Sequence, residues 1–350
     1  MTDITEKVKD YYGQILQSSQ DLKTNACCSV SPPPEHIQHI LMNIDREIVE
    51  RFYGCGSPIP VSVEGCTILD MGCGTGRDVY VCSSLVGEAG RVIGVDMTEE
   101  QLEVARRHQE PQAQRFGYDQ SNVTFLQGYM EDLAALDIDD SSVDVVISNC
   151  VINLSPNKEQ VFSEIFRVLK PGGELYFSDI FSDRRLPEHL CDDPVLVGEC
   201  LAGAMYIEDF RRVLLNLNVP DYRILDQRLL AMTNPEIEAK VGTAGFYSMT
   251  VRAFKLNSLE DKCEDYGQVA TYLGTIKNEP NSFDLDDHHK FITGKPMLVC
   301  GNTASMISET RLKRHFRVDG DRSVHYGLFP CILTDNSGNT EPLTTVNACC

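Results

Sequence analysis

Apolar residues recur at helical spacing in the first fifty positions of the chain. Val8 and Ile15 fall on one side of a helical projection of residues 6–17, which predicts an amphipathic helix there. A run of prolines then precedes a second apolar stripe, and a glycine-rich turn follows it. The prolines before the stripe and the glycines after it predict a second helix from Glu35 to about Phe52.

From residue 66 the pattern changes to short apolar segments separated by glycine turns and amphipathic helices. Such alternation is typical of repeated β-α-β units, which build a parallel sheet. The predicted strands are 67–70, 91–95, 123–126, 143–148 and 174–180, and predicted helices at 77–86, 99–109 and 157–169 lie between them.

Beyond residue 182 the alternation becomes irregular. Residues 184–203 are predicted as loop, 206–217 as an amphipathic helix, and 223–233 and 246–256 as strands that can finish the sheet as an antiparallel pair. Residues 258–350 show two or three weak strand patterns, and we expect the last fifteen residues to form a flexible tail. The predicted division is therefore 1–182 for the helices and sheet, 183–257 for the closing segment, and 258–350 for a small α+β module.

The charge and composition of the chain limit the kinds of partner that it can bind. The chain has 350 residues, with 31 Lys and Arg against 52 Asp and Glu, and its net charge of −21 disfavours nucleic acid and anionic membranes. No apolar run approaches the roughly 20 residues of a membrane span, and the start lacks a signal-peptide core, so we expect a cytoplasmic protein. In that reducing compartment, fourteen cysteines favour free thiols over a disulfide framework.

The strongest local signal is the decapeptide LDMGCGTGRD, in which a buried strand runs through Asp70 into a glycine turn and then a helix. Gly72, Gly74 and Gly76 allow the backbone to turn sharply and to approach a bound cofactor closely. A dinucleotide fingerprint requires glycine where Arg77 stands, and the Gly-Lys-Ser/Thr of a phosphate-binding loop is absent. The turn therefore favours a cofactor without phosphates.

Positions downstream of the glycine turn indicate an adenosyl ligand. Asp96 ends the second predicted strand, where a carboxylate can bind both hydroxyls of a ribose, and Met97 follows it. Met130 and Glu131 can hold an adenine ring and its amino group. Asn149, at the end of the fourth strand, completes the candidate cofactor-binding residues.

With the LKPGG turn at 169–173, these residues resemble the class I S-adenosylmethionine-dependent methyltransferases, and the resemblance covers residues 66–180. It implies an α/β fold with a Rossmann-like sheet and S-adenosyl-L-methionine as methyl donor. The carboxyl end of the fourth strand then faces the methyl group, so we expect Cys150 to lie beside the reacting methyl group. Cys200, after the fifth strand, is expected over the same edge, where two thiols can share one soft ion.

The cysteine segments together resemble the arsenite methyltransferase family. The segments DLKTNAC, YGCG, ILDMGCGTGRD, NVTFLQGYMEDL, SNCVINL, VLKPGGELYFSDI and GECL appear in family order over residues 8–255, and the vicinal-cysteine tail of the family is echoed by Cys349 and Cys350. The resemblance makes 183–257 an arsenical-binding segment. It also implies small arsenic(III) thiol complexes as substrates, mono- and dimethylated products and a role in detoxification. We expect the protein to be a monomer.

The resemblance further assigns roles to five cysteines. It implies that Cys150 and Cys200 hold trivalent arsenic and that Cys55 joins them in binding and redox turnover. The first family cysteine falls on Cys27, but Cys28 adjoins it, and which of the two acts stays open. Thiolates suit soft arsenic(III), whose lone pair can attack a methyl carbon. The two electrons that methylation consumes can come from thiols that form a disulfide, later reduced by thioredoxin or glutathione.

Two other functions are a methyltransferase with a different acceptor and a metalloid-binding protein without activity. A class I methyltransferase that acts on carbon or oxygen requires a general base, which Asn149 and Cys150 do not obviously provide. A thiol-rich metalloid binder without activity leaves the glycine turn and Asp96 unexplained. We expect His288 and His289 to form a solvated surface pair. Small core or loop positions are expected for the remaining cysteines, which are Cys66, Cys73, Cys82, Cys191, Cys263, Cys300 and Cys331.

Overall fold

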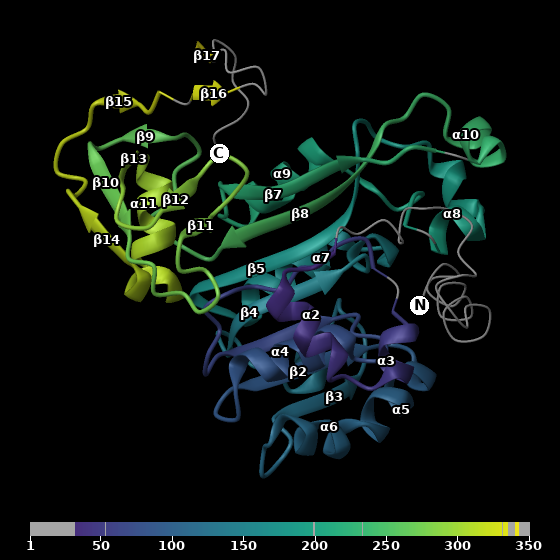
Figure 1. Cartoon of the computed structure of the whole chain (residues 1–350). Coiled ribbons are helices and arrows are strands. Elements are labelled where there is room, and N and C mark those ends of the chain that lie inside the picture. Colours follow the sequence, from purple (N-terminus) through teal and green to yellow (C-terminus); the bar gives the residue numbers. More distant parts are fainter. Residues whose placement is uncertain are drawn as a thin grey trace.

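The computed structural model describes residues 32–52, 54–198, 200–232, 234–330, 332–334 and 340–342 (Figure 1). The predicted first helix, Cys27, Cys28, Cys331 and the terminal cysteines lie outside the described residues.

A mixed sheet of eight strands forms the centre of the described chain (Figure 1). Its order is β3-β2-β1-β4-β5-β8-β7, with β6 paired to β5. The first five strands are parallel to one another, whereas β8 runs antiparallel to both β5 and β7, so the predicted closing pair is confirmed. The bounds are β1 Thr67–Met71, β2 Arg91–Asp96, β3 Val123–Gln127, β4 Val143–Asn149, β5 Leu169–Ser182, β6 Met205–Tyr206, β7 Tyr222–Leu229 and β8 Phe246–Phe254.

Helices cover both faces of this sheet, and each face has its own apolar core. On one face α7 (Lys158–Val168) and α9 (Ile207–Asn216) pack Phe162 and Phe210 against the strands. On the other face α2 (Glu35–Met42), α3 (Arg46–Glu50), α4 (Arg77–Val86) and α5 (Glu99–Arg107) contribute the second core. Burial on both faces explains why these strands are nearly continuous apolar runs.

Three predicted segments differ from the structure. The helix predicted from 35 to about 52 is two helices, because Asp45 begins α3 by accepting the N–H of Glu47 at 3.1 Å. The helix predicted over 99–109 ends at Arg107, and α6 (Gln109–Phe116) follows it. The predicted loop 184–203 contains the short 3-10 helix η5 (Glu188–Asp192) and α8 (Pro194–Gly198). Another helix, α10 (Pro235–Val241), lies between β7 and β8.

The C-terminal residues form a more ordered module than the weak strand patterns predicted. Its core contains Tyr272, Phe283, Phe291 and Phe316. Helix α11 has the sequence GNTASMIS, whose small polar residues conceal it from an amphipathic pattern. The elements are β9 Glu264–Asp265, β10 Gln268–Tyr272, β11 Ser282–Asp284, β12 Lys290–Ile292, β13 Pro296–Val299, α11 Gly301–Ser308, η6 Arg311–His315, β14 Phe316–Asp319, β15 Gly327–Leu328, β16 Ile332–Thr334 and β17 Thr340–Pro342.

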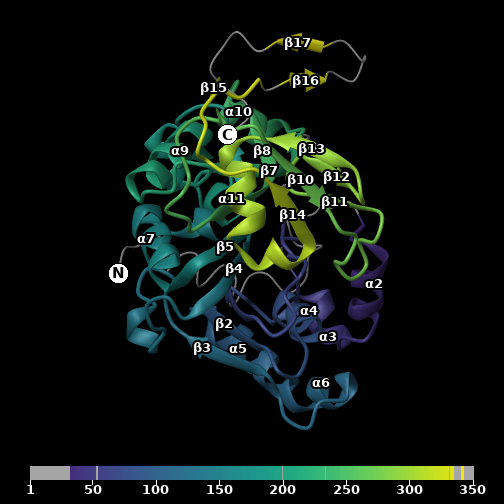
Figure 2. The ribbon, with the colours of Figure 1, turned by 90° about the vertical axis from the view of Figure 1, so that its left-hand side faces the viewer.

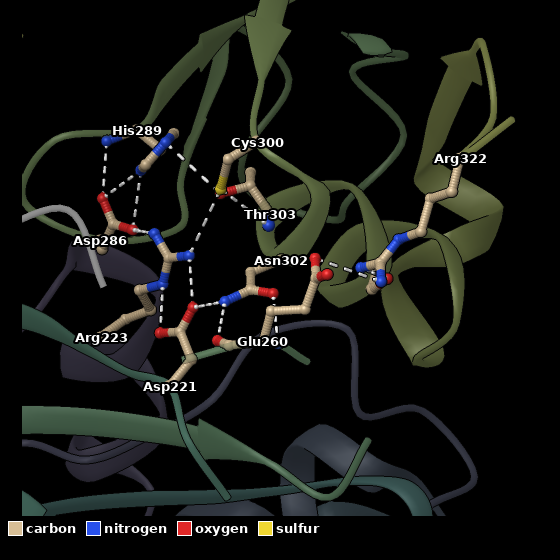
Figure 3. Close-up of polar contacts among 10 residues, drawn as sticks. Asp221, Arg223, Glu260, Asp286, His289, Cys300, Asn302, Thr303 and Arg322 are labelled. Atoms are coloured by element: carbon tan, nitrogen blue, oxygen red, sulfur yellow. Dashed lines mark hydrogen bonds and ion pairs between the residues drawn. The ribbon is translucent and has the colours of Figure 1, made fainter. Parts of the chain in front are cut away.

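The module packs beside β7, at the edge of the sheet opposite β3 (Figure 2). A buried ion network joins the two (Figure 3). Arg223 of β7 donates to Asp221 at 2.9 and 2.8 Å and to Asp286 of the module at 3.1 Å. Asp286 also contacts Nδ1 of His289 at 2.9 Å, and His289 is only 9% exposed, so the prediction of a solvated position was wrong for His289, whereas His288 is exposed as predicted.

Candidate active site

The predicted glycine turn lies at the carboxyl end of β1 and adopts left-handed backbone. The φ angles are 75° at Gly72, 52° at Gly74 and 87° at Gly76, a region that favours glycine. A Cβ on Gly74 would meet no atom within 4 Å, which leaves that face of the turn open for a ligand. A Cβ on Gly76 would approach the Phe125 ring at 2.9 Å, so this third glycine permits helix packing.

A cleft opens above the turn, at the carboxyl ends of β1, β2 and β4. Eight of the nine predicted cofactor-binding residues line it, namely Asp70, Gly72, Gly74, Asp96, Met97, Met130, Glu131 and Asn149. The ninth, Gly76, caps α4 below the cleft. Residues that sequence reasoning missed also line the cleft, among them Phe52, Arg77, Asp78, Thr98 and Ser155. Arg77 and Asp78 stand inside the glycine-turn decapeptide, so the motif itself could have indicated them.

Asp96 is oriented by the backbone around it. One carboxylate oxygen accepts the N–H of Gly74 at 2.9 Å, and the other accepts the N–H of Thr98 at 2.8 Å. Burial raises the pKa of Asp96, and these two donors oppose that rise. The carboxylate is thereby held at the end of β2, with the cleft before it.

Asp78 is a second acidic residue of the cleft, and the side chain of Arg77 positions it. Arg77 donates to Asp78 at 2.8 Å, and its guanidinium carbon lies 3.0 Å from the centre of the Phe52 ring. Burial, together with the charges of Asp78 and Asp96, raises the pKa of Asp70 well above its usual value.

Asn149 ties the loop before β1 to the end of β4. Its amide oxygen accepts the N–H groups of Cys55 and Gly56, each at 3.2 Å, and its nitrogen donates to Gly56 at 2.9 Å and to Asp78 at 3.0 Å. Ser248 of β8 donates to the Cys55 carbonyl at 2.9 Å. These contacts bring Cys55 beside Cys150, across 95 residues of sequence.

We call Cys55, Cys150 and Cys200 the sulfur cluster. Cys55 and Cys150 are joined by a disulfide, and the thiol of Cys200 donates to the Cys150 carbonyl at 2.9 Å. The expectation that the cysteines stay free was wrong for this pair, because compartment statistics do not report the geometry that Asn149 imposes. It was also wrong for Cys263, which is disulfide-bonded as well. The three residues are 2%, 3% and 0% exposed, and Cys150 also lines the cleft.

Both Cys150 and Cys200 adopt left-handed backbone, which few residues other than glycine do. Their φ angles are 60° and 63°. Such a conformation costs on the order of 1–3 kcal/mol and persists where surrounding contacts impose it. Here the Cys150 N–H donates to Ser178 at 2.8 Å, and the Cys200 N–H donates to Val197 at 3.1 Å. Strained backbone therefore coincides with the two cysteines that the sequence placed at the chemistry.

A buried carboxyl and a buried amine, both missed from the sequence, flank the sulfur cluster. A carboxyl oxygen of Asp179 in β5 lies within 4.8 Å of the sulfurs of Cys55 and Cys150. Burial raises the pKa of Asp179 to about 7, although Asn153 donates to it at 3.1 and 2.7 Å. Lys158, the first residue of α7, donates to the Ser155 carbonyl at 3.0 Å, and burial lowers its pKa. The sequence signal that could have indicated Asp179 was an acidic residue inside an otherwise apolar predicted strand.

Comparisons with known proteins cover both halves of the chain. The family model of the methyltransferase domain matches residues 62–223, and that of the arsenite methyltransferase C-terminal domain matches residues 265–348. Arsenite methyltransferase of Aquipseudomonas alcaligenes is 49% identical over 324 residues, which is 93% of either chain. Arsenite methyltransferase of Homo sapiens is 40% identical over 319 residues, 90% of this chain and 84% of that protein.

A solved structure agrees with these matches. The crystal structure of an arsenic(III) S-adenosylmethionine methyltransferase from Chlamydomonas reinhardtii is 52% identical in sequence, with a TM-score of 0.82. The alignment covers 85% of this chain and 100% of that one. The predicted class I methyltransferase fold is confirmed. Among the described residues, none of the helices has the length and apolarity that crossing a membrane requires.

Proposed function

The chain belongs to the arsenite methyltransferase family, and on that premise we propose that it transfers methyl groups from S-adenosylmethionine to trivalent arsenic bound by Cys55, Cys150 and Cys200. The observation that carries this proposal is the double position of Cys150, which lines the cofactor cleft and belongs to the sulfur cluster. A thiol there puts bound arsenic against the methyl donor.

The cleft fits S-adenosylmethionine by its shape and its donor set. The open face of Gly74 admits a ligand close to the backbone, and Asp96 would bind the ribose hydroxyls. Met130 and Glu131 would hold the adenine, with Met97 and Asn149 completing the wall. When bound, the cofactor supplies a methyl group activated on a sulfonium sulfur.

Three soft thiolates suit arsenic(III) better than carboxylates or imidazoles do. Once the Cys55–Cys150 disulfide is reduced, the cluster can offer all three sulfurs at one place. The arsenic keeps one lone pair, which would form the new bond to the methyl carbon as the bond from that carbon to the sulfonium sulfur breaks and the sulfur keeps its electron pair. The protein then contributes mainly proximity and alignment, which can supply up to about 7–11 kcal/mol of a barrier.

Methyl transfer raises arsenic formally to the pentavalent state, so each turnover requires two electrons. Two thiols supply them when they form a disulfide and release two protons. We propose that the Cys55–Cys150 disulfide is a product of this step and that thioredoxin or glutathione reduces it. Cys27 or Cys28, which lie outside the described residues, would support the first methylation, and mono- and dimethylated arsenicals would be the products.

We also propose a division of labour along the chain. Residues 1–182 bind the cofactor, residues 183–257 supply Cys200 to the arsenic site, and residues 258–350 form a structural module whose own ligands are not assigned. The arrangement of β7 and β8 supports this division, because the middle segment both closes the sheet and covers the sulfur cluster.

Product analysis tests the proposal. The reduced protein is incubated with arsenite, glutathione and methyl-labelled S-adenosylmethionine, and products are identified by mass spectrometry. Labelled mono- and dimethylated arsenicals are expected. Variant Cys66→Ser serves as the control, because Cys66 lies outside the sulfur cluster. Turnover of the cofactor without labelled arsenicals would contradict arsenic methylation and favour a carbon or oxygen acceptor.

A further inference from the structure

A fourth thiol, that of Cys191, lies at the outer side of the sulfur cluster. Its Sγ is 3.8 Å from the carbonyl oxygen of Ala202, two residues beyond Cys200. Cys191 packs against the apolar cluster that contains Cys55, Cys150 and Cys200. Sequence reasoning assigned it to the core or to a loop, but its surroundings are those of the arsenic site.

Cys191 differs from the sulfur cluster in its access to solvent. The three cluster cysteines are at most 3% exposed, whereas Cys191 is only half-buried. It stands on η5, in the segment between β5 and β6 that also carries Cys200. The ion pair between Lys240 of α10 and Asp193, at 2.5 Å, fixes this segment from outside. Cys191 is therefore partly exposed, whereas the cysteines of the sulfur cluster that it packs against are buried.

The buried amine of Lys158 connects the two environments. Its ammonium is close enough to Cys191 and to Cys200 for charge interaction with both, and it also interacts with Asp179. One cation thus faces the half-buried thiol, a buried thiol and the carboxyl beside the disulfide.

We propose that Cys191 is the entry ligand for arsenic(III), which it takes from a solvent thiol complex and passes to Cys200. This inference rests on the proposed function, in which the sulfur cluster is the final arsenic site. At each transfer one arsenic–sulfur bond forms as another breaks, and the proton of the entering thiol leaves on the displaced thiol. Arsenic stays trivalent throughout, so no oxidant or reductant is required.

Capture kinetics test the inference. Reduced protein is mixed with arsenite pre-complexed to glutathione, and the growth of arsenic–sulfur absorbance is followed for wild type, Cys191→Ser and the control Cys66→Ser. Cys66 is half-buried like Cys191 but packs in the core on the α2 and α4 side of the sheet. We expect about tenfold slower capture for Cys191→Ser, because the arriving complex loses its local ligand, and wild-type capture for Cys66→Ser.

Single-turnover methyl transfer with preloaded arsenic separates entry from chemistry. Cys191→Ser should match wild type there, whereas an equal loss in capture and transfer would overturn the entry role. Unchanged capture in Cys191→Ser would also overturn it. Cys200→Ser is run beside these variants. If Cys200→Ser still binds arsenic as wild type does, the proposed function fails. If Cys200→Ser loses binding while Cys191→Ser captures normally, only the entry role fails.

Discussion

Two buried polar clusters of this protein are built on opposite electrostatic principles. The sulfur cluster lies at the carboxyl end of the sheet, where Asp179 has a pKa raised by burial to about 7. The ion network lies between β7 and the C-terminal module, where Arg223 contacts two carboxylates. There a hydrogen bond from His289 and the charge of Arg223 outweigh burial and lower the pKa of Asp286.

The difference teaches what each cluster can do. Charges that are paired and hydrogen-bonded stay ionised and fix geometry, whereas groups near neutrality can exchange protons and ligands. Each cluster also contains a buried cysteine. Cys200 is held in left-handed backbone beside a disulfide, while Cys300 caps α11 by accepting the N–H of Thr303 at 3.4 Å. In the function that we propose, cysteine therefore serves chemistry in one cluster and architecture in the other.

Replacing a buried cysteine by serine in each cluster should give the largest difference between the two clusters. Cys200→Ser should abolish methylation of arsenite and of monomethylated arsenic, because a hard oxygen replaces an immediate arsenic ligand. Cys300→Ser should retain methylation, since a hydroxyl can still accept the Thr303 N–H. Mass spectrometry of products checks both variants. Loss of activity in Cys300→Ser with an unchanged fold would give the ion network a catalytic role.

Removing the cation should break the ion network. Arg223→Met leaves Asp221 and Asp286 buried without their shared partner, and we expect a loss of about 3–5 kcal/mol in the free energy of unfolding. Arg212→Met provides the control, because the Arg212 pair with Asp209 is exposed and such pairs contribute about 0–1 kcal/mol. Chemical denaturation measures both, and equal losses would show that the network has no special weight.

The two clusters should respond to pH with opposite sign. Asp179 has a folded pKa of about 7, above its unfolded value, so the stability it contributes is present below about pH 4 and disappears as pH rises through 7. Asp286 has a lowered folded pKa, so its contribution is present above the unfolded value near 3.8 and disappears as pH falls further.

Denaturation of wild type and Asp179→Asn across pH 5–8 measures the first effect. The difference between their unfolding free energies should change by on the order of 2–4 kcal/mol over this range, and Asp286→Asn should show no such change there. The offset between variants reflects altered hydrogen bonds, so the slope is the informative quantity. A pH-independent difference for Asp179→Asn would contradict the raised pKa.

The smallest expected effect concerns the cofactor cleft beside the sulfur cluster. Asp96→Ala should weaken binding of S-adenosylmethionine by about 1.5–3 kcal/mol, the usual contribution of hydrogen bonds to a charged group. Gly74→Val should weaken it further, because its side chain would enter the cleft from a left-handed residue. Calorimetry measures both affinities. Wild-type affinity in Asp96→Ala would remove the ribose assignment, while arsenic capture should be unaffected in either case.

The sequence predicted the central sheet well because local rules govern it. Apolar runs and glycine turns placed the first four parallel strands to within one residue, and the antiparallel closing pair was anticipated. The fifth strand was predicted too short, because β5 begins at Leu169 and includes the LKPGG segment that was predicted as a turn. The broken helix at Asp45 and the short elements of the C-terminal module were missed, because capping contacts and small polar residues leave little periodic signal. The glycine turn and the strand ends that follow it predicted eight residues that line the cleft, and Asp78 stands inside the same motif, whereas Ser155 required the cleft itself.

By itself the sequence determined the fold class, the glycine turn after β1 and the set of cysteines that the chain offers, since these depend on residue type at local spacing. Only the tertiary structure decided which thiols meet. Asn149 of β4 and Ser248 of β8 both hydrogen-bond to the backbone of Cys55 and so hold it near Cys150, and β5 places Asp179 beside both sulfurs. Contacts between residues about a hundred positions apart depend on how strands are ordered in the sheet, and the chemistry of the cluster follows from that order.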